Sequence, residues 1–182
     1  MSLEEKMVES GIKKILIADD TSSNLEAAKE YFSSLEKYGI KTDYASSAKQ
    51  AKEKIQAAYK SKEKYSVVIS DMVMEDPHSG LQVVREGFKH QTFSFIATGR
   101  NYHKSDREAH GPYTQLEPML GTISGKKEKP EVWKEIFGKT LEHITGKAKP
   151  TIAALERYHK YAGKPSDEIA DMLMDLYKSS SE

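Results

Sequence analysis

The sequence predicts an α/β protein with a doubly wound, five-stranded parallel sheet and a C-terminal helical extension. Several short runs are rich in apolar residues; in the first, residues 14–18 (KILIA), four apolar residues follow one another and would be buried on both faces, as is typical of a strand in a parallel sheet. Between these runs, apolar residues recur at the three- and four-residue spacing of an amphipathic helix. Alternating strands and helices favour right-handed crossovers, which place helices on both faces of the sheet.

The composition limits the classes of function. The chain has 182 residues, with 28 Lys and Arg against 28 Asp and Glu, and no cysteine. This length suits one domain with an appendage, and the absence of cysteine excludes disulfides and cysteine-based zinc sites. A net charge of zero argues against binding dominated by nucleic-acid phosphates or anionic lipid. Because no long apolar run or signal-peptide pattern is present, we expect a cytoplasmic protein with no membrane partner.

We divide the chain into an N-terminal tail (1–12), an α/β domain (13–146) and a C-terminal helical hairpin (147–182). The expected strands cover 14–18, 40–45, 65–70, 93–97 and 119–124. The first helix is expected after a capping box of Ser23 and Glu26, and the next after a similar pair, Ser47 and Gln50. Further helices are expected at 81–88 and from Pro130 onward. The residues expected to face inward on the hairpin are Ile152, Leu155, Tyr158, Ile169, Met172, Leu173 and Leu176.

Polar residues follow three of the expected strands. Asp19 and Asp20 come after the first, Asp71 after the third and Thr98 after the fourth. A single Asp in such a place is commonly a cap or turn residue. The carboxyl ends of parallel strands meet at one edge of the sheet, however, so these four side chains are expected to converge. Clustered carboxylates suit Mg²⁺, and an Asp so placed can act as a nucleophile toward phosphorus.

The segments KKILIADD, YSVVISDMVM and FSFIATG resemble the three hallmark segments of the response-regulator receiver domain of two-component signalling, over residues 13–145. The resemblance implies a flavodoxin-like fold with strand order 2-1-3-4-5. It also implies that Asp19, Asp20 and Asp71 hold Mg²⁺ together with the carbonyl of Val73. Asp71 would be the phosphoacceptor, and Thr98 would be the hydroxyl that binds a phosphoryl oxygen.

A lysine that pairs with the phosphoryl group is also implied by the resemblance. Two registers are open. In the favoured one Lys126 is this residue, and Lys127 replaces the proline that follows it in the family. In the other one Lys129 and Pro130 form the Lys-Pro pair, which would make the preceding strand hydrophilic.

Three features depart from the family. Glu75 stands where proline is usual, and one extra residue precedes Gly80 in the turn after the third strand. With Lys126 as the anchor, Ile123 takes the place of the aromatic residue that normally moves inward on activation. These departures affect the face through which receivers normally signal, while the phosphorylation site is expected to be complete.

The resemblance implies a signalling module, not an enzyme: a histidine kinase or phosphotransfer protein would phosphorylate Asp71 with Mg²⁺ bound, as in a phosphorelay. The hairpin would pack on the domain or mediate a homodimer, and it lacks the basic recognition helix of a DNA-binding domain. One alternative is a haloacid-dehalogenase-type phosphohydrolase, although the Asp-x-Asp that this family requires is absent. Another is a degenerate receiver that serves as an interaction scaffold.

Overall fold

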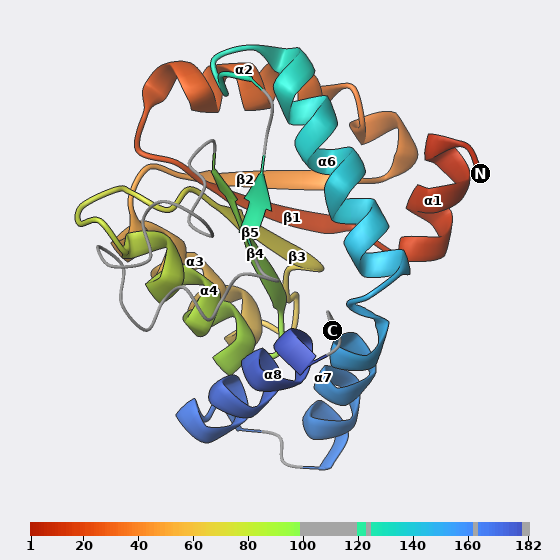
Figure 1. Ribbon diagram of the computed structural model, residues 1–182, viewed down its shortest axis with the longest axis vertical. Helices are drawn as coiled ribbons and strands as arrows, with labels where there is room; N and C mark the ends of the chain where they lie inside the picture. Colours follow the sequence, from red (N-terminus) through yellow and green to blue (C-terminus); the bar gives the residue numbers. More distant parts are fainter. Residues whose placement is uncertain (99–119, 123–124, 162–163, 180–182) are drawn as a thin grey trace.

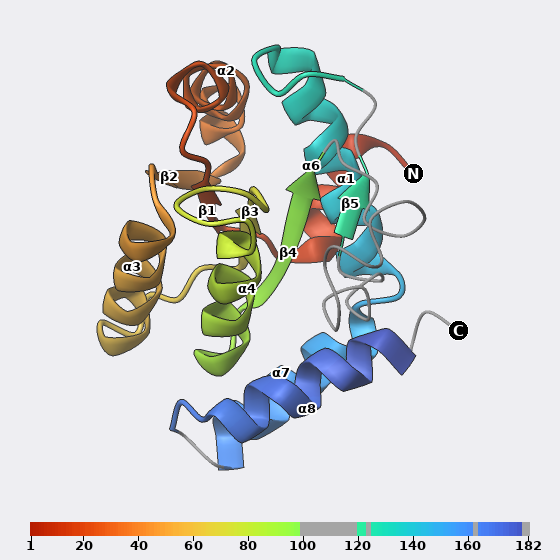
Figure 2. The ribbon, with the colours of Figure 1, turned by 60° about the vertical axis from the view of Figure 1, so that its left-hand side comes forward.

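The computed structural model describes the backbone of residues 1–98, 120–122, 125–161 and 164–179. In this part of the chain a central parallel sheet lies between two layers of helices (Figure 1). Helices α1, α2 and α6 lie on one side of the sheet, and α3 and α4 lie on the other (Figure 2). The bounds of these helices are Leu3–Ser10 (α1), Ser22–Ser33 (α2), Ala48–Lys60 (α3), Ser79–Lys89 (α4) and Pro130–Thr145 (α6), and a short 3-10 helix, η1, covers Glu36–Tyr38.

The described strands form one parallel sheet in the order β2-β1-β3-β4-β5. The expected alternation of helices and strands around a parallel sheet is therefore confirmed. Four strands form most of the sheet, and the fifth is a three-residue segment beside β4. The strands are Lys14–Ala18 (β1), Lys41–Ala45 (β2), Val67–Ser70 (β3), Phe93–Thr98 (β4) and Leu120–Thr122 (β5).

The strands separate two hydrophobic clusters. Along β1, Ile15 and Ile17 belong to the larger cluster, while Leu16 and Ala18 belong to the smaller one. The larger cluster includes Phe32 of α2 with Trp133 and Phe137 of α6, and the smaller one includes Ala48, Ala51, Ile55 and Ala58 of α3. Because successive side chains of a strand point to opposite faces, the apolar run of β1 is buried on both sides.

The N-terminal residues differ from the expected tail. They contain α1, which begins with a reciprocal capping box: the Ser2 hydroxyl accepts the N–H of Glu5, and the Glu5 carboxylate accepts the N–H of Ser2. Met7 is buried in the larger cluster, beside α6. The sequence pattern Ser-x-x-Glu at positions 2–5 is the usual sign of such a helix start, and it could have identified this helix.

Two expected helix starts have different outcomes. The capping box of Ser23 and Glu26 was a wrong prediction, because α2 begins at Ser22 with Thr21 as its N-cap, which makes no side-chain capping bond. At α3, Ser47 is the N-cap, as expected, and accepts the N–H of Gln50. The Gln50 side chain binds the N–H of Ser46 instead of that of the N-cap residue, so the box is only half formed.

The C-terminal hairpin consists of α7 (Lys149–Tyr161) and α8 (Asp167–Ser179). It lies beside the amino-terminal end of β4, where the ring of Tyr177 is 5.3 Å from that of Phe93 between centroids (Figure 2). Leu155 and Leu173 are buried as expected, but Met172 is 44% exposed, contrary to the prediction. Arg85 of α4 forms ion pairs with Asp171 and Asp167 of α8, so the hairpin packs on its own domain. None of the described helices has the length and apolar character needed to cross a membrane.

Candidate functional site

The strand register places the two most important carboxylates side by side. Ala18 of β1 pairs with Ser70 of β3, so Asp19 and Asp71 follow at the same level on neighbouring strands. Backbone hydrogen bonds continue past the strand ends: the N–H of Asp71 donates to Ala18 at 2.8 Å, and that of Asp19 donates to Ala45 at 3.0 Å. The carboxyl edge of the sheet therefore positions both side chains through its own hydrogen bonds.

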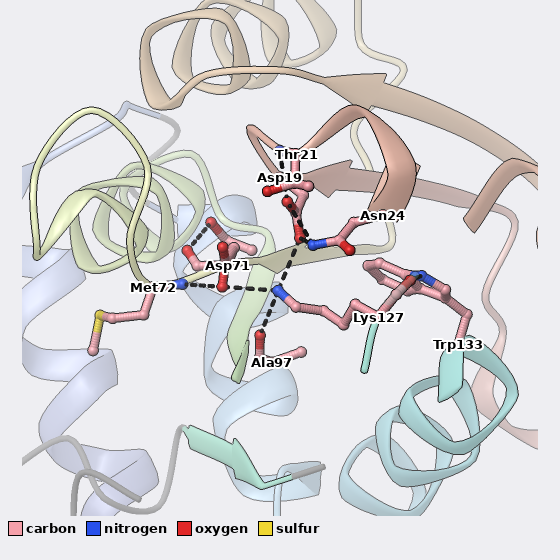
Figure 3. Close-up of polar contacts among 9 residues, drawn as sticks. Asp19, Thr21, Asn24, Asp71, Met72, Ala97, Lys127 and Trp133 are labelled. Atoms are coloured by element: carbon pink, nitrogen blue, oxygen red, sulfur yellow. Dashed lines mark hydrogen bonds and ion pairs between the residues drawn. The ribbon is translucent and has the colours of Figure 1, made fainter. Parts of the chain in front are cut away.

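Asp19 is fully buried, and its carboxylate is held from several directions. The N–H of Thr21 donates to Oδ1 at 3.0 Å, and the amide of Asn24 donates to Oδ1 and Oδ2 at 3.2 and 3.1 Å (Figure 3). Thr21 and Asn24 lie at the start of α2, so this helix fixes the orientation of Asp19. A buried carboxylate needs such donors because water is excluded from it.

A lysine from the loop before α6 lies between the carboxylates. Nζ of Lys127 is 2.8 Å from Oδ2 of Asp19 and 2.8 Å from Oδ1 of Asp71, and it donates to the carbonyl of Ala97 at 3.3 Å (Figure 3). Its side chain is only 9% exposed. The ammonium group thus joins the ends of β1, β3 and β4. Charged hydrogen bonds of this kind are strong because they are little screened by solvent.

Asp71 is more accessible than Asp19, with 18% of its side chain exposed. Its Oδ1 accepts the N–H of Met72 at 3.0 Å and faces Lys127. Burial raises the pKa of Asp71, and the neighbouring Asp19 carboxylate acts in the same direction. The Lys127 ammonium and the N–H of Met72 partly oppose that rise in the pKa. Because both of these contacts use Oδ1, Oδ2 is the oxygen better placed to react or to bind a ligand.

The acidic residues form a group that could hold a metal ion. Asp19, Asp20 and Asp71 each offer a carboxylate oxygen, and these three oxygens lie within 4.8 Å of one another. Asp19 is buried, Asp71 is half-buried and Asp20 is exposed, so the group opens to solvent on one side. Three hard oxygen donors at a solvent-open edge fit a divalent cation that keeps part of its water shell. We call Asp19, Asp20, Asp71 and Lys127 the acidic site.

Two other predicted site residues, Thr98 and Val73, lie at the end of β4 and shortly after the end of β3. Thr98 is buried at the end of β4, next to Ala97, whose carbonyl accepts Lys127. Val73 is half-buried, and its side chain packs against the larger hydrophobic cluster. The place assigned to the missing aromatic residue, Ile123, lies outside the described residues.

The loop after Asp71 is held by hydrogen bonds to the starts of two helices. At the start of α4, Gly80 donates its N–H to the carbonyl of Met72 at 2.8 Å, and a β-carbon at Gly80 would lie only 2.1 Å from the carbonyl oxygen of Asp71. The carboxylate of Glu75 accepts the N–H groups of Ala48 at 2.7 Å and Lys49 at 3.1 Å, at the start of α3. Glu75 thus ties this loop to α3.

The predicted lysine was wrong by one position. Lys126 and Lys129 are exposed, whereas Lys127 is the lysine that enters the acidic site. The N–H of Lys129 donates to the carbonyl of Lys126 at 3.1 Å, so this segment is a tight turn in which neighbouring side chains point different ways. The number of residues between the expected strand and helix does not define the geometry of this turn, so it could not show which lysine points into the site. A second residue that the sequence reasoning did not associate with the site is Trp133, whose indole N–H binds the carbonyl of Lys127.

Comparisons with known proteins do not extend this description: no protein-family model matches the chain, and the search of curated proteins finds no significant match. The class of the protein therefore has to be argued from the fold and the acidic site.

Proposed function

We propose that this chain is a phosphoacceptor receiver domain with a flavodoxin-like fold, in which Asp71 is phosphorylated. The observation that carries the proposal is the position of Lys127, whose Nζ lies 2.8 Å from both Asp19 and Asp71 at the carboxyl edge of the sheet. The strand order β2-β1-β3-β4-β5, with helices on both faces, supports the same assignment. Ligands of open α/β sheets bind at this edge, so the site has the expected location.

The side chains would divide the chemistry among them. Oδ2 of Asp71 attacks the phosphorus of the donor, a new O–P bond forms, and the bond from phosphorus to the leaving group breaks, with its electron pair going to that group. Lys127 would stay near the carboxylate and pair with a phosphoryl oxygen, and Thr98 at the end of β4 would donate its hydroxyl to another. The product is an aspartyl phosphate. In this proposal the chain is the acceptor of the phosphoryl group and not an enzyme that acts on a separate substrate.

The proposed cofactor is Mg²⁺, held by Asp19, Asp20 and Asp71 with the carbonyl of Val73. Oxygen donors are the ligands that this ion prefers, and the exposed Asp20 leaves room for ligands from solvent or a phosphoryl group. When bound, the ion would compensate the negative charge that a phosphoryl group brings beside three carboxylates.

The proposed phosphodonor is a histidine kinase or a phosphotransfer protein, and the added charge on Asp71 would shift an equilibrium between two conformations. The loop from Asp71 to His78 leads directly into α4, and α4 carries Arg85, which pairs with Asp171 of the hairpin. Packing of the hairpin on α4 supports a role in responding to that shift. Self-association through the hairpin is the second proposed role. Truncation after residue 146 should then convert an oligomer into a monomer, as judged from the molar mass in light scattering relative to the mass of one truncated chain.

The decisive experiment is incubation with acetyl phosphate and Mg²⁺, followed by intact-mass analysis of the wild type and of Asp71→Asn. The wild type should gain the mass of one phosphoryl group, and Asp71→Asn should not. Asp76→Asn is a matched control in the same loop, because Asp76 caps the turn through the N–H of His78 and lies outside the acidic site. It should be modified like the wild type.

The alternatives give different results. Phosphoryl addition that survives Asp71→Asn would exclude Asp71 as the acceptor. Sustained turnover of p-nitrophenyl phosphate would favour a phosphohydrolase, although the residues two positions after Asp19 and Asp71 are Thr21 and Val73, not Asp. Absence of any modification, together with absence of beryllofluoride binding, would favour a scaffold without phosphorylation.

A further inference from the structure

One of three neighbouring lysines contacts the carboxylates of the acidic site. Lys126, Lys127 and Lys129 lie in the segment that leads into α6, and only the side chain of Lys127 reaches the carboxylates among these three. All three have the same chemistry, so their backbone positions must decide which one enters. The question is what holds this turn in the register that selects Lys127.

Trp133 forms a hydrogen bond to the backbone of Lys127 within this turn. Its indole Nε1–H donates to the carbonyl of Lys127 at 2.7 Å, and the residue is only 1% exposed (Figure 3). The indole ring lies in the larger hydrophobic cluster, 6.3 Å from the ring of Phe32 in an edge-on arrangement. A buried indole N–H requires an acceptor, and the packed core prevents this ring from turning toward another one.

The backbone on both sides of Lys127 is also held against the start of α6. The N–H of Lys129 donates to Lys126, and the N–H of Val132 donates to Lys129, both at 3.1 Å. A β-carbon at Gly125 would lie 2.8 Å from Cγ2 of Val132, which shows how closely the chain approaches the helix before the turn. These contacts shape the turn, but the indole bond is the one made to Lys127 itself.

We infer that Trp133 is a positioning residue that selects Lys127 for the acidic site. A shift of the turn by one residue would place Lys126 or Glu128 where Lys127 now lies, and it would leave the indole N–H without the Lys127 carbonyl. The core side chain thus determines which ammonium group compensates the two carboxylates. This inference does not require phosphorylation of Asp71, because it concerns the lysine position in the unmodified protein.

The test removes the N–H and keeps the ring. Trp133 is replaced by β-(3-benzothienyl)alanine, in which sulfur takes the place of the indole N–H, and the lysines are acetylated with a limiting reagent and mapped by mass spectrometry. In the wild type, Lys127 should react much more slowly than Lys126 and Lys129, because it is paired and 9% exposed. In the variant, acetylation of Lys127 relative to Lys126 should rise about fivefold, the factor for loss of one net hydrogen bond.

A matched control separates positioning from general loss of stability. Phe137→Leu alters a fully buried side chain one turn further along α6 and does not touch the indole bond. The two variants are compared at temperatures that give them the same free energy of unfolding. Under these conditions Lys127 of the Phe137→Leu variant should remain protected from acetylation. Unchanged protection of Lys127 in the benzothienyl variant, or an equal rise in Phe137→Leu, would overturn the inference.

A second readout links the inference to the proposed function. Binding of beryllofluoride with Mg²⁺ should weaken in the benzothienyl variant and stay close to wild type in Phe137→Leu at equal stability. If the wild type itself binds no beryllofluoride, the proposed function fails, and the acetylation pattern still decides the role of Trp133.

Discussion

Nζ of Lys127 lies 2.8 Å from Oδ1 of Asp71, although the two residues lie far apart in the sequence. The same Nζ is equally close to Asp19, so one ammonium group serves two carboxylates. This arrangement explains how two acidic side chains can lie side by side at the sheet edge. It also makes Lys127 the residue whose removal should most change the chemistry of Asp71.

We therefore expect Lys127→Met to impair the acidic site and Lys126→Met to have little effect. Loss of the ammonium removes the influence that lowers the pKa of Asp71, so the pKa of this carboxyl group should rise further above its usual value. Affinity for beryllofluoride with Mg²⁺ should fall about thirtyfold, as expected for loss of a charged hydrogen bond of about 2 kcal/mol. Beryllofluoride binding can be followed by the fluorescence emission of Trp133, the single tryptophan of the sequence. An equal loss in both variants would contradict this prediction.

Gly80 is required by a close approach of backbone to backbone. A β-carbon there would lie 2.1 Å from the carbonyl oxygen of Asp71 and 2.7 Å from Cα of Met72. Gly80→Ala should therefore lower the free energy of unfolding by about 3 kcal/mol, because the obstructing atoms belong to the backbone. Urea denaturation checks this value.

Gly138 provides the matched control for that measurement. It lies inside α6, and a β-carbon there would meet nothing within 4 Å. Gly138→Ala should raise the free energy of unfolding by up to about 1 kcal/mol, because alanine restricts the unfolded chain and favours the helix. If both alanine variants behaved alike, the close approach at Gly80 would not be the cause.

Glu75 is expected to stabilise α3 from outside the helix. Its carboxylate accepts the N–H groups of Ala48 and Lys49, two donors that the first turn cannot satisfy internally. Slight burial acts to raise the pKa of Glu75, but these backbone hydrogen bonds outweigh it and hold the pKa below its usual value. Glu75→Ala should therefore cost about 1 kcal/mol, as for loss of a helix cap.

The pH dependence gives the sign of this effect. The pKa of Glu75 is lower in the folded state, so its contribution is complete above the unfolded value of 4.5 and is lost as the pH falls through the folded value. The stability difference between wild type and Glu75→Ala should shrink on acidification. Glu53→Ala, at an exposed position of α3, should show no such change.

His143 should make the fold sensitive to acid near its junction with the hairpin. Nδ1 of His143 lies 2.7 Å from Oη of Tyr177 of α8, and its ring stacks on Phe95. Burial, followed by the charges of Lys147 and Lys139, lowers the pKa of His143 to about 4. Below pH 6.5 the unfolded state therefore binds more protons than the folded state, and stability falls as the pH is lowered from 6.5 toward 4.

His143→Gln tests this dependence, because glutamine can hydrogen-bond to Tyr177 but does not titrate. The wild type should lose about 2 kcal/mol more than His143→Gln across this range, allowing for the partial exposure of the ring. Thermal melts at a series of pH values are sufficient. Parallel pH profiles for the two proteins would exclude His143 as the source.

The sequence alone determined the strands, most helices and the carboxylates at the strand ends. Apolar runs such as 14–18 report burial on both faces, and a parallel sheet brings the residues after its strands together at one edge. Asp19 and Asp71 could be predicted together for this reason, since strand ends need no knowledge of loop geometry. The start of α1 was also readable, from the pair Ser2 and Glu5.

The tertiary structure decided the details that depend on turns and on contacts between distant segments. Lys126 and Lys127 are equivalent in the sequence, and only the turn before α6 and the bond from Trp133 select Lys127. Glu75 is a simple departure from a family pattern in the sequence, whereas the folded chain places the start of α3 beside it. Local periodicity reports which face of an element is buried, but the direction of a side chain in a turn is set by whatever the folded chain brings next to it.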